Sequence, residues 1–332
     1  MKITYLGAGA WGYCLASLLA KKGYHVSLWT RNSLLADRLN SGQDHPHLPG
    51  WGPPATLAIT TNLEEALHKT DIIIESVTAA GLRPVLNLLY QICRPACPIV
   101  MTSKGIEQNT GLILPEVAIE IFGQSARSQV GFLSGPGYAQ EVIAGLPTSV
   151  VGSAFDYDVM LKICDIFTTN TFRVYPNSDI CGVAYGGALK NIIAIACGIS
   201  EGLGLGSSSK AALITRGLHE IRKLAVARGC KTETIYGLSG MGDMCLTCCS
   251  MISRNSRFGY LIAQGKTPKE AESEIEMVVE GAYTCVSALQ LSRQIQIEMP
   301  ITEIVYKIIY ENMRPIDAVH SLMLRTIKEE HL

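Results

Sequence analysis

Gly7-Ala8-Gly9-Ala10-Trp11-Gly12 is the stretch of sequence that decides the fold of this chain. It has the form G-x-G-x-x-G and lies between a β-rich run, Lys2 to Leu6, and a helical run, Tyr13 to Lys22. Glycines suit such a turn because a close backbone approach leaves no room for Cβ atoms, and free N–H groups at a helix start can meet a pyrophosphate. A second β-rich run, His25 to Thr30, completes a β-α-β unit. The pattern predicts a dinucleotide-binding turn in which the contacting residues are Gly7, Gly9, Ala10, Trp11 and Gly12.

Alternating strands and helices continue from this unit to about residue 175. Further β-rich runs lie near Leu57–Thr60, Asp71–Val77, Ile99–Thr102, Val130–Leu133, Ser149–Gly152 and Thr171–Val174. Helical runs between them lie near Ser33–Asn40, Leu63–His68, Gly81 and Leu112–Phe122. This alternation predicts an α/β domain with a mostly parallel, doubly wound, Rossmann-like sheet.

The pattern changes after about Asp179, where apolar residues recur three and four positions apart. Helical spacing is found in Gly187–Cys197, Ala211–Arg228, Pro268–Met277, Thr284–Gln294, Ile301–Tyr310 and Pro315–Met323. A chain of 332 residues is long enough for two domains. We therefore predict a nucleotide-binding α/β domain over residues 1–177 and an all-helical domain over residues 178–332.

The composition excludes several classes of partner. Lys plus Arg number 28 against 29 Asp plus Glu, so no summed positive field attracts nucleic acid or an anionic membrane. With 48% hydrophobic and 17% charged residues, the chain is also far from the disordered class. We expect no secretory signal, because Met1 to Leu6 lead directly into Gly7-Ala8-Gly9 without the basic, apolar and small-residue segments of such a signal. We also expect no membrane-inserted helix, because the closest apolar run, Ile192 to Ile199, is interrupted at Gly198 and followed by Glu201. The expected location is the cytoplasm.

The eleven cysteines are an odd number scattered along a long chain, which indicates reduced thiols rather than a disulfide framework. Cys245-Leu246-Thr247-Cys248-Cys249 contains the C-x₂-C spacing of zinc ligands. No second ligand pair follows at a suitable distance, so we predict buried thiols and no metal site.

The end of the second β-rich run bears on the choice of cofactor. Sites that prefer NAD usually place a carboxylate there for the ribose 2′-hydroxyl, whereas this chain has Trp29-Thr30-Arg31-Asn32. Arg31 suits a 2′-phosphate, so NADP(H) is favoured over NAD(H). The alternative is a solvated arginine that stacks on adenine or contacts nothing.

Several further segments occur in an order that resembles the bacterial NAD(P)-dependent sn-glycerol-3-phosphate dehydrogenases. They are Ser103-Lys104-Gly105-Ile106-Glu107, Ser134-Gly135-Pro136, Gly187-Ala188-Leu189-Lys190-Asn191, Leu213-Ile214-Thr215-Arg216-Gly217, Gly240-Met241-Gly242-Asp243, Ser253-Arg254-Asn255 and Val279-Glu280-Gly281. The resemblance covers nearly the whole chain. It implies a helical domain like that of 6-phosphogluconate dehydrogenase, an active site in the cleft between the domains, and reversible reduction of dihydroxyacetone phosphate to sn-glycerol 3-phosphate for phospholipid synthesis.

The resemblance also implies roles for two lysines and an aspartate. Lys190 matches the general acid and base, and Lys104 matches a residue that contacts both the substrate and the nicotinamide end of the cofactor. Asp243 matches the acceptor that binds substrate and holds Lys190, with Thr247 one helical turn beyond. Lysine at its ordinary pKa of about 10.4 is a poor base near neutrality, so this role requires burial or neighbouring cations. The alternatives are an interfacial lysine at 190 and a helix N-cap at Asp243.

The other implied positions bind phosphate, substrate or cofactor. Ser253, Arg254 and Asn255 offer a hydroxyl, a guanidinium and an amide for a phosphate dianion, the alternative being a solvated basic loop with Arg257. Residues matched to the substrate are Gly135 and Gly137, and those matched to the cofactor are Ala139, Arg254, Val278 and Glu280, besides Lys104. Two departures, Gly137 in place of threonine and the serines at 207–209, leave local substrate contacts open.

Two other functions remain as alternatives. A related dehydrogenase acting on a hydroxy acid would need a carboxylate anchor in place of the phosphate cluster. A nucleotide sensor without chemistry would have no need to keep Lys104, Lys190, Asp243 and Arg254 together. The helical half could bury a homodimer face, and the sequence does not separate that face from the internal core.

Overall fold

The computed structural model describes residues 1–327, 329 and 330, and its contacts divide the chain into two compact units. The first unit comprises Met1–Ser103 and Leu114–Ile180, and the second comprises Lys104–Ile113 and the chain from Cys181 onward. The segment after Ser103 thus packs with the second unit, although it lies within the first half of the sequence. The predicted division at residues 177 and 178 stays a prediction.

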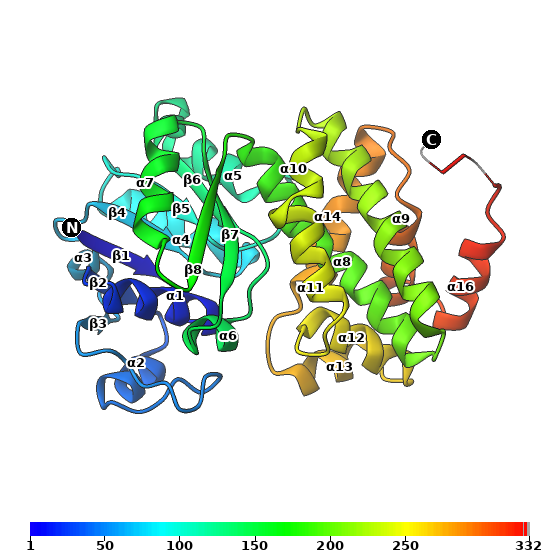
Figure 1. Cartoon of the computed structure of the whole chain (residues 1–332), viewed down its shortest axis with the longest axis horizontal. Coiled ribbons are helices and arrows are strands. Elements are labelled where there is room, and N and C mark those ends of the chain that lie inside the picture. The colour runs from blue at the N-terminus through cyan, green and yellow to red at the C-terminus, as the bar shows by residue number, and fades with distance from the viewer. Residues whose placement is uncertain (328, 331–332) are drawn as a thin grey trace. The chain divides into compact units, whose positions relative to one another are not determined.

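The first unit is built on an eight-stranded sheet of order β3-β2-β1-β4-β5-β6-β7-β8 (Figure 1). The strands are β1 Lys2–Leu6, β2 His25–Trp29, β3 Leu57–Thr60, β4 Ile72–Glu75, β5 Ile99–Met101, β6 Val130–Ser134, β7 Thr148–Ala154 and β8 Phe172–Asn177. All neighbours are parallel except β6 and β7. The predicted doubly wound, mostly parallel sheet is confirmed, and its strand order reverses between β1 and β4.

The helices of this unit connect the strands as crossover segments. They are α1 Ala10–Lys21, α2 Ser33–Asn40, α3 Leu63–Leu67, α4 Ala79–Ile92, α5 Leu114–Phe122, α6 Ala139–Ile143 and α7 Tyr157–Phe167, with a 3₁₀ turn at Gln124–Gln129. The sequence pattern did not predict α6 and α7. A start signal for α7 was present, since the Asp156 side chain accepts hydrogen bonds from the N–H groups of Asp158 and Val159.

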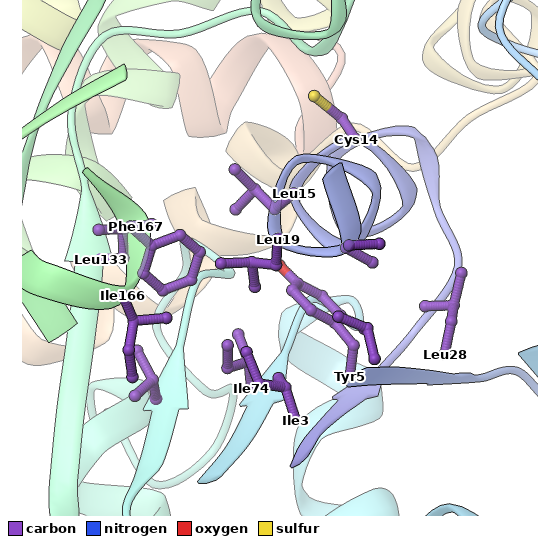
Figure 2. Packing of buried hydrophobic residues seen from close by; sticks show 14 of the residues in the cluster. Ile3, Tyr5, Cys14, Leu15, Leu19, Leu28, Ile74, Leu133, Ile166 and Phe167 are labelled. Carbon is purple, nitrogen blue, oxygen red and sulfur yellow. The ribbon is translucent and has the colours of Figure 1, made fainter. Parts of the chain in front are cut away.

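The core of the first unit lies between the sheet and α1 and α7 (Figure 2). Ile3 and Tyr5 of β1 and Ile74 of β4 point toward Leu15 and Leu19 of α1, and Ile166 and Phe167 of α7 close the cluster (Figure 2). Every one of these side chains is almost fully buried. The central strands β1 and β4 bury both of their faces, so their sequences are mostly apolar rather than alternating. The edge strands β3 and β8 instead alternate buried and more exposed residues.

The second unit is helical apart from the bridge between Ile106 and Ile113, over the residues that the structure describes (Figure 1). Its helices are α8 Ile180–Gly202, α9 Gly206–Ala227, α10 Thr232–Tyr236, α11 Asp243–Cys248, α12 Arg254–Ala263, α13 Pro268–Ile275, α14 Glu280–Gln294, α15 Pro300–Tyr310 and α16 Pro315–Met323, and a π-turn spans Leu238–Gly242. The expected helical domain is confirmed, with α10, α11 and α12 added to the predicted segments.

The helix α8 forms the centre of this unit. It is long and apolar enough to cross a membrane by length and composition, a property that we had not expected from the interrupted run ending at Ile199. Because 94% of its most apolar window is buried inside the protein, it has the character of a core helix. Close packing against α12 explains the glycines: a Cβ on Gly198 would lie 1.9 Å from the Ser256 carbonyl oxygen, and one on Gly259 would lie 2.1 Å from that of Ile195.

Candidate active site

Two lysines converge on one buried aspartate inside the second unit. The Lys104 Nζ donates to Asp243 Oδ2 at 2.5 Å, and the Lys190 Nζ donates to Asp243 Oδ1 at 2.7 Å. Lys190 also donates to Thr247 Oγ1 at 2.5 Å, and the Thr247 hydroxyl donates to the Asp243 carbonyl oxygen at 2.7 Å. The structure therefore brings together the predicted chemical residues and Thr247.

Local backbone structure places Asp243 against α8. The π-turn before it passes close to other backbone atoms, since a Cβ on Gly240 would lie 2.0 Å from the Ile235 carbonyl oxygen. A Cβ on Gly186 of α8 would in turn lie 3.0 Å from the Gly240 Cα, so both positions need glycine. Gly242, and not Asp243, is the N-cap of α11. The Asp243 carboxylate binds the two lysines and does not cap the helix.

Burial changes the acid–base character of Lys190. Desolvation lowers the pKa of its ammonium group to about 8, with Asp243 acting in the opposite direction and the Lys104 charge lowering it further. The side chain is only 8% exposed, and its amine is held by two partners rather than directed to solvent. A lysine in this state can both donate and accept a proton near neutral pH.

The predicted phosphate cluster divides into structural and exposed members. Asn255 is buried, where its Nδ2 donates to Asn191 Oδ1 at 3.0 Å and its Oδ1 accepts from the Gly281 N–H at 2.9 Å. The Ser253 hydroxyl oxygen caps α12 by accepting from the Ser256 N–H. Arg254 is exposed. Of the three, it alone offers an exposed charged group, and the other two side chains already serve the fold.

Arg254 lies beside the two residues matched to the cofactor's ribose side. Its guanidinium donates to the Val278 carbonyl oxygen at 3.3 Å and interacts electrostatically with Glu280, the first residue of α14. The structure thus brings Arg254, Val278 and Glu280 together within the second unit.

The glycine turn of the first unit has the geometry that a pyrophosphate requires. Gly7 has a φ of +100°, and a Cβ there would lie 2.9 Å from the Ser76 carbonyl oxygen. A Cβ on Gly12 would lie 2.1 Å from the Gly7 carbonyl oxygen, whereas nothing lies within 4 Å of one on Gly9. Gly9 is also the N-cap of α1 and supplies no side-chain acceptor. The first N–H groups of the helix remain available, so these residues fit a dinucleotide.

A cavity of about 360 Å³ lies beside Gly9, where the adenosine end of a dinucleotide would follow the fingerprint. Its lining includes Thr30, Asn32, Arg38 and His47. Arg31 is exposed and does not line it. Nothing in the sequence indicated Arg38, whose Nε donates to the Asp44 carbonyl oxygen in the loop of residues 41–54. That loop lies against the glycine turn, since His45 Nε2 is 3.0 Å from the Ala8 carbonyl oxygen, and its polar sequence does not predict this contact.

The other predicted positions of the first unit are Gly135, Gly137 and Ala139, of which Gly137 lies against Trp11. A Cβ on Gly137 would lie 3.2 Å from the Trp11 ring, so the indole takes much of the space of a side chain at 137. Gly135 has a φ of +150°, and a Cβ there would lie 2.8 Å from the Val150 Cα. Ala139 begins α6, which packs on α1. Substrate contact by Gly135 and Gly137 stays a prediction.

All eleven cysteines, which lie within the described residues, are free thiols. Of the three cysteines in the C-x₂-C run, only Cys248 is buried; Cys245 is half-buried and Cys249, which follows α11, is exposed. The prediction of buried thiols is therefore correct for Cys248 and wrong for Cys249, because the helix ends there at the surface. Among residues 1–327, 329 and 330, no group of three or more His, Cys, Asp or Glu side chains could hold a metal ion.

Comparisons with known proteins agree with this arrangement. Residues 2–159 match the family model described as the N-terminus of NAD-dependent glycerol-3-phosphate dehydrogenase, and residues 179–320 match the model of its C-terminus. A glycerol-3-phosphate dehydrogenase [NAD(P)+] of Protochlamydia amoebophila is 63% identical over 331 residues, covering 100% of this chain and 99% of the relative. One of Chlamydia caviae is 52% identical over 331 residues, with the same shares covered. The crystal structure of a glycerol-3-phosphate dehydrogenase from Coxiella burnetii is 37% identical with a TM-score of 0.93, covering 98% of this chain and 99% of that one.

Proposed function

The chain belongs to the NAD-dependent glycerol-3-phosphate dehydrogenase family, and on that premise we propose that it reversibly reduces dihydroxyacetone phosphate to sn-glycerol 3-phosphate with NAD(P)H. Lys190 is the proposed general acid and base. The proposed physiological direction is reduction in the cytoplasm, which supplies the backbone of phospholipids. The observation that carries the proposal is the buried Lys190 amine held between Asp243 and Thr247.

The glycine turn at Gly7, Gly9 and Gly12 would hold NAD(P)H, which would supply a hydride for carbon C2 of the ketone and leave the C=O electron pair on oxygen. In the proposed step that oxygen takes a proton from the Lys190 ammonium, which becomes a neutral amine. In the reverse direction the amine takes the proton from the C2 hydroxyl. Asp243 fixes Lys190 in place, and the Lys104 charge stabilises negative charge that develops on the oxygen.

The substrate phosphate is assigned to Arg254. A guanidinium presents two parallel N–H donors to phosphate oxygens, and Arg254 is the exposed charged member of its cluster. The buried Asn255 amide has a structural role, because it binds the Asn191 side chain of α8 and the Gly281 N–H of α14. Ser253 supports the same helix start through its cap.

The assay that tests the function measures initial rates of NADPH oxidation, and separately of NADH oxidation, with dihydroxyacetone phosphate. Unphosphorylated dihydroxyacetone is the control, and its turnover should be lower by at least about 10²-fold because remote binding energy is lost. If nucleotide binds and neither cofactor is turned over, the substrate assignment is wrong, and the hydroxy-acid and sensor alternatives return.

The same assay tests the proposed preference for NADP(H). Arg31→Ala should lower the NADPH to NADH rate ratio by about tenfold or more if Arg31 pairs with the 2′-phosphate, since a hydrogen bond to a charged group contributes about 1.5–3 kcal/mol. Arg38→Ala is the comparison, because Arg38 lines the cavity beside Gly9 and Arg31 does not. A ratio that changes only in the Arg38 variant would move the assignment to that residue.

A pair of glycine variants separates cofactor binding from folding. Gly9→Ala should leave the free energy of unfolding within about 1 kcal/mol, because the new Cβ meets no protein atom within 4 Å. It should weaken NADPH binding at least about tenfold, since the Cβ occupies the space where a phosphate approaches the backbone. Gly12→Ala should instead destabilise the first unit by about 2 kcal/mol or more, because its Cβ would overlap the Gly7 carbonyl oxygen. Fluorescence titration with NADPH and thermal unfolding measure the two effects, and unchanged NADPH affinity in Gly9→Ala would contradict the assignment.

A further inference from the structure

A buried carboxyl group that the proposed mechanism does not use lies at the end of β4. Glu75 is fully buried. Its Oε2 accepts from the Val77 N–H at 3.0 Å and from the Ser103 hydroxyl at 3.0 Å. Its Oε1 is buried and has no hydrogen-bond partner among the described residues. A buried carboxylate oxygen without a hydrogen-bond partner destabilises the ionised form of the group, so ionised Glu75 would need a further partner.

Glu75 lies at the point where the strand order of the sheet reverses. It is opposite Leu6 of β1 on one side and Met101 of β5 on the other. The residue after it, Ser76, packs against the glycine turn, since its carbonyl oxygen would lie 2.9 Å from a Cβ on Gly7. A dinucleotide crosses an open sheet at this reversal, with one mononucleotide half on each side. The β1–β2 side carries the adenosine half, which leaves the nicotinamide half to the side of β4 and β5.

The hydrogen-bond partners of Glu75 within the first unit are neutral donors on the segments after β4 and β5. These donors are N–H groups and hydroxyls, and burial raises the pKa of Glu75 to about 7. Tyr5 of β1 is a titratable neighbour of Glu75, and its pKa is raised by burial and by the Glu75 charge. Cys14 of α1 lies near Tyr5, and burial raises the pKa of its thiol as well. Both stay neutral throughout the range in which Glu75 titrates.

We propose that Glu75 couples proton binding to the redox state of the cofactor, because its carboxylate sits beneath the nicotinamide half-site and interacts with the positive ring of the oxidised form. This inference rests on the proposed function, which supplies the cofactor. The ionised carboxylate favours NAD(P)+, whose ring carries a positive charge. The neutral dihydronicotinamide ring carries no such charge, so it gives the ionised carboxylate no advantage over the protonated form.

The direction of the pH effect follows from this linkage. Binding of the oxidised cofactor stabilises ionised Glu75, so at acidic pH a proton must leave and the affinity falls. Binding of the reduced cofactor gives ionised Glu75 no such stabilisation, so its affinity does not rise with pH. The ratio of the dissociation constant of NADPH to that of NADP+ should therefore increase as pH passes through about 7. Both nucleotides carry the same 2′-phosphate, so titration of that phosphate cancels in the ratio.

The experiment measures both dissociation constants calorimetrically near pH 6 and near pH 8 for the wild type, Glu75→Gln and Glu220→Gln. Glu220 is a matched control: it is also buried, its pKa is also raised to about 7, and it binds Ile301 and Thr302 in the second unit. The ratio should rise about tenfold between the two pH values in the wild type and in Glu220→Gln, and by less than about twofold in Glu75→Gln.

Each outcome bears on one of the two proposals. If neither nucleotide binds the wild type, the proposed function fails. A wild-type ratio that does not change with pH overturns the role of Glu75 while leaving the function intact, as does an equal rise in Glu75→Gln. Should Glu75→Gln not fold, proton release by the wild type is measured instead, from the heat of NADP+ binding in buffers of different ionisation enthalpy near pH 7. Release of a fraction of a proton with NADP+ and none with NADPH supports the proposal, and equal release with both overturns it.

Discussion

Lys190→Met should lower the turnover of dihydroxyacetone phosphate by about 10² to 10⁴-fold, the range that a positioned general acid contributes. Methionine keeps the length and bulk of the side chain, and Asp243 retains its ion pair with Lys104. NADPH affinity should stay within about twofold, because the glycine turn belongs to the first unit. Initial rates and a fluorescence titration of the same preparation measure the two quantities.

Lys190→Arg is the matched control for charge. A guanidinium keeps the positive charge beside Asp243 but does not give up a proton at neutral pH, since its pKa exceeds 12. If charge alone sufficed, the arginine variant would keep most of its activity. We expect it to lose at least about 10²-fold as well. Near-wild-type turnover in either variant would refute Lys190 as the proton donor.

The pH profile of the wild type follows from the lowered pKa of Lys190, about 8. Oxidation of glycerol 3-phosphate needs the neutral amine, so its rate should rise with pH and level off above about 8. Reduction needs the ammonium, so its rate should fall over the same interval. A profile of oxidation that keeps rising toward pH 10 would indicate an unperturbed lysine or another base. Rates in both directions across this range are the measurement.

The fold was predictable where segments that are adjacent in sequence also pack together in the structure. The run Lys2–Leu6, the glycine turn and the helix behind it form one β-α-β unit whose parts are adjacent in sequence. The helices α10 to α12 were harder, because α10 and α11 have only five and six residues and α12 opens with the polar run Arg254–Arg257. The helix α6 has five residues and no side-chain cap, so it carries almost no local signal.

The candidate site was predictable only in part, and on different grounds from the fold. Asp243 and Lys190 are 53 positions apart, and their resemblance to family motifs, rather than any periodicity, brought them together. Asn255 shows the limit of such an argument, because its place beside Arg254 suggests a phosphate ligand while its partners Asn191 and Gly281 are distant in sequence. Glu75 did have a local signal, since an acidic residue ends the apolar run Ile72–Ile74 in a strand that buries both faces. An ionisable residue in such a strand merits a chemical explanation.

Asp243→Ala should have the largest effect on stability, because it leaves two lysines side by side without their shared counter-ion. The Lys190 side chain is 8% exposed and that of Lys104 17%, so solvent cannot replace the carboxylate fully. Removing one partner of a buried ion pair costs about 3–5 kcal/mol. Thr247→Val is the matched control: it removes a neutral acceptor of the same Lys190 amine and should cost about 1–2 kcal/mol.

The distribution of tryptophans allows this loss to be located. Trp11, Trp29 and Trp51 all lie in the first unit, so tryptophan fluorescence follows the sheet, whereas the helical signal in circular dichroism comes largely from the second unit. In urea, Asp243→Ala should move the dichroism transition to lower denaturant while changing the fluorescence transition much less. Asp243→Asn should fall between Ala and wild type and should lower the pKa of Lys190 further, because the carboxylate that raises it is gone. The activity that remains should then shift its pH dependence toward acid. Equal stability of Asp243→Ala and Thr247→Val would show that the carboxylate serves the lysines no better than a neutral acceptor does.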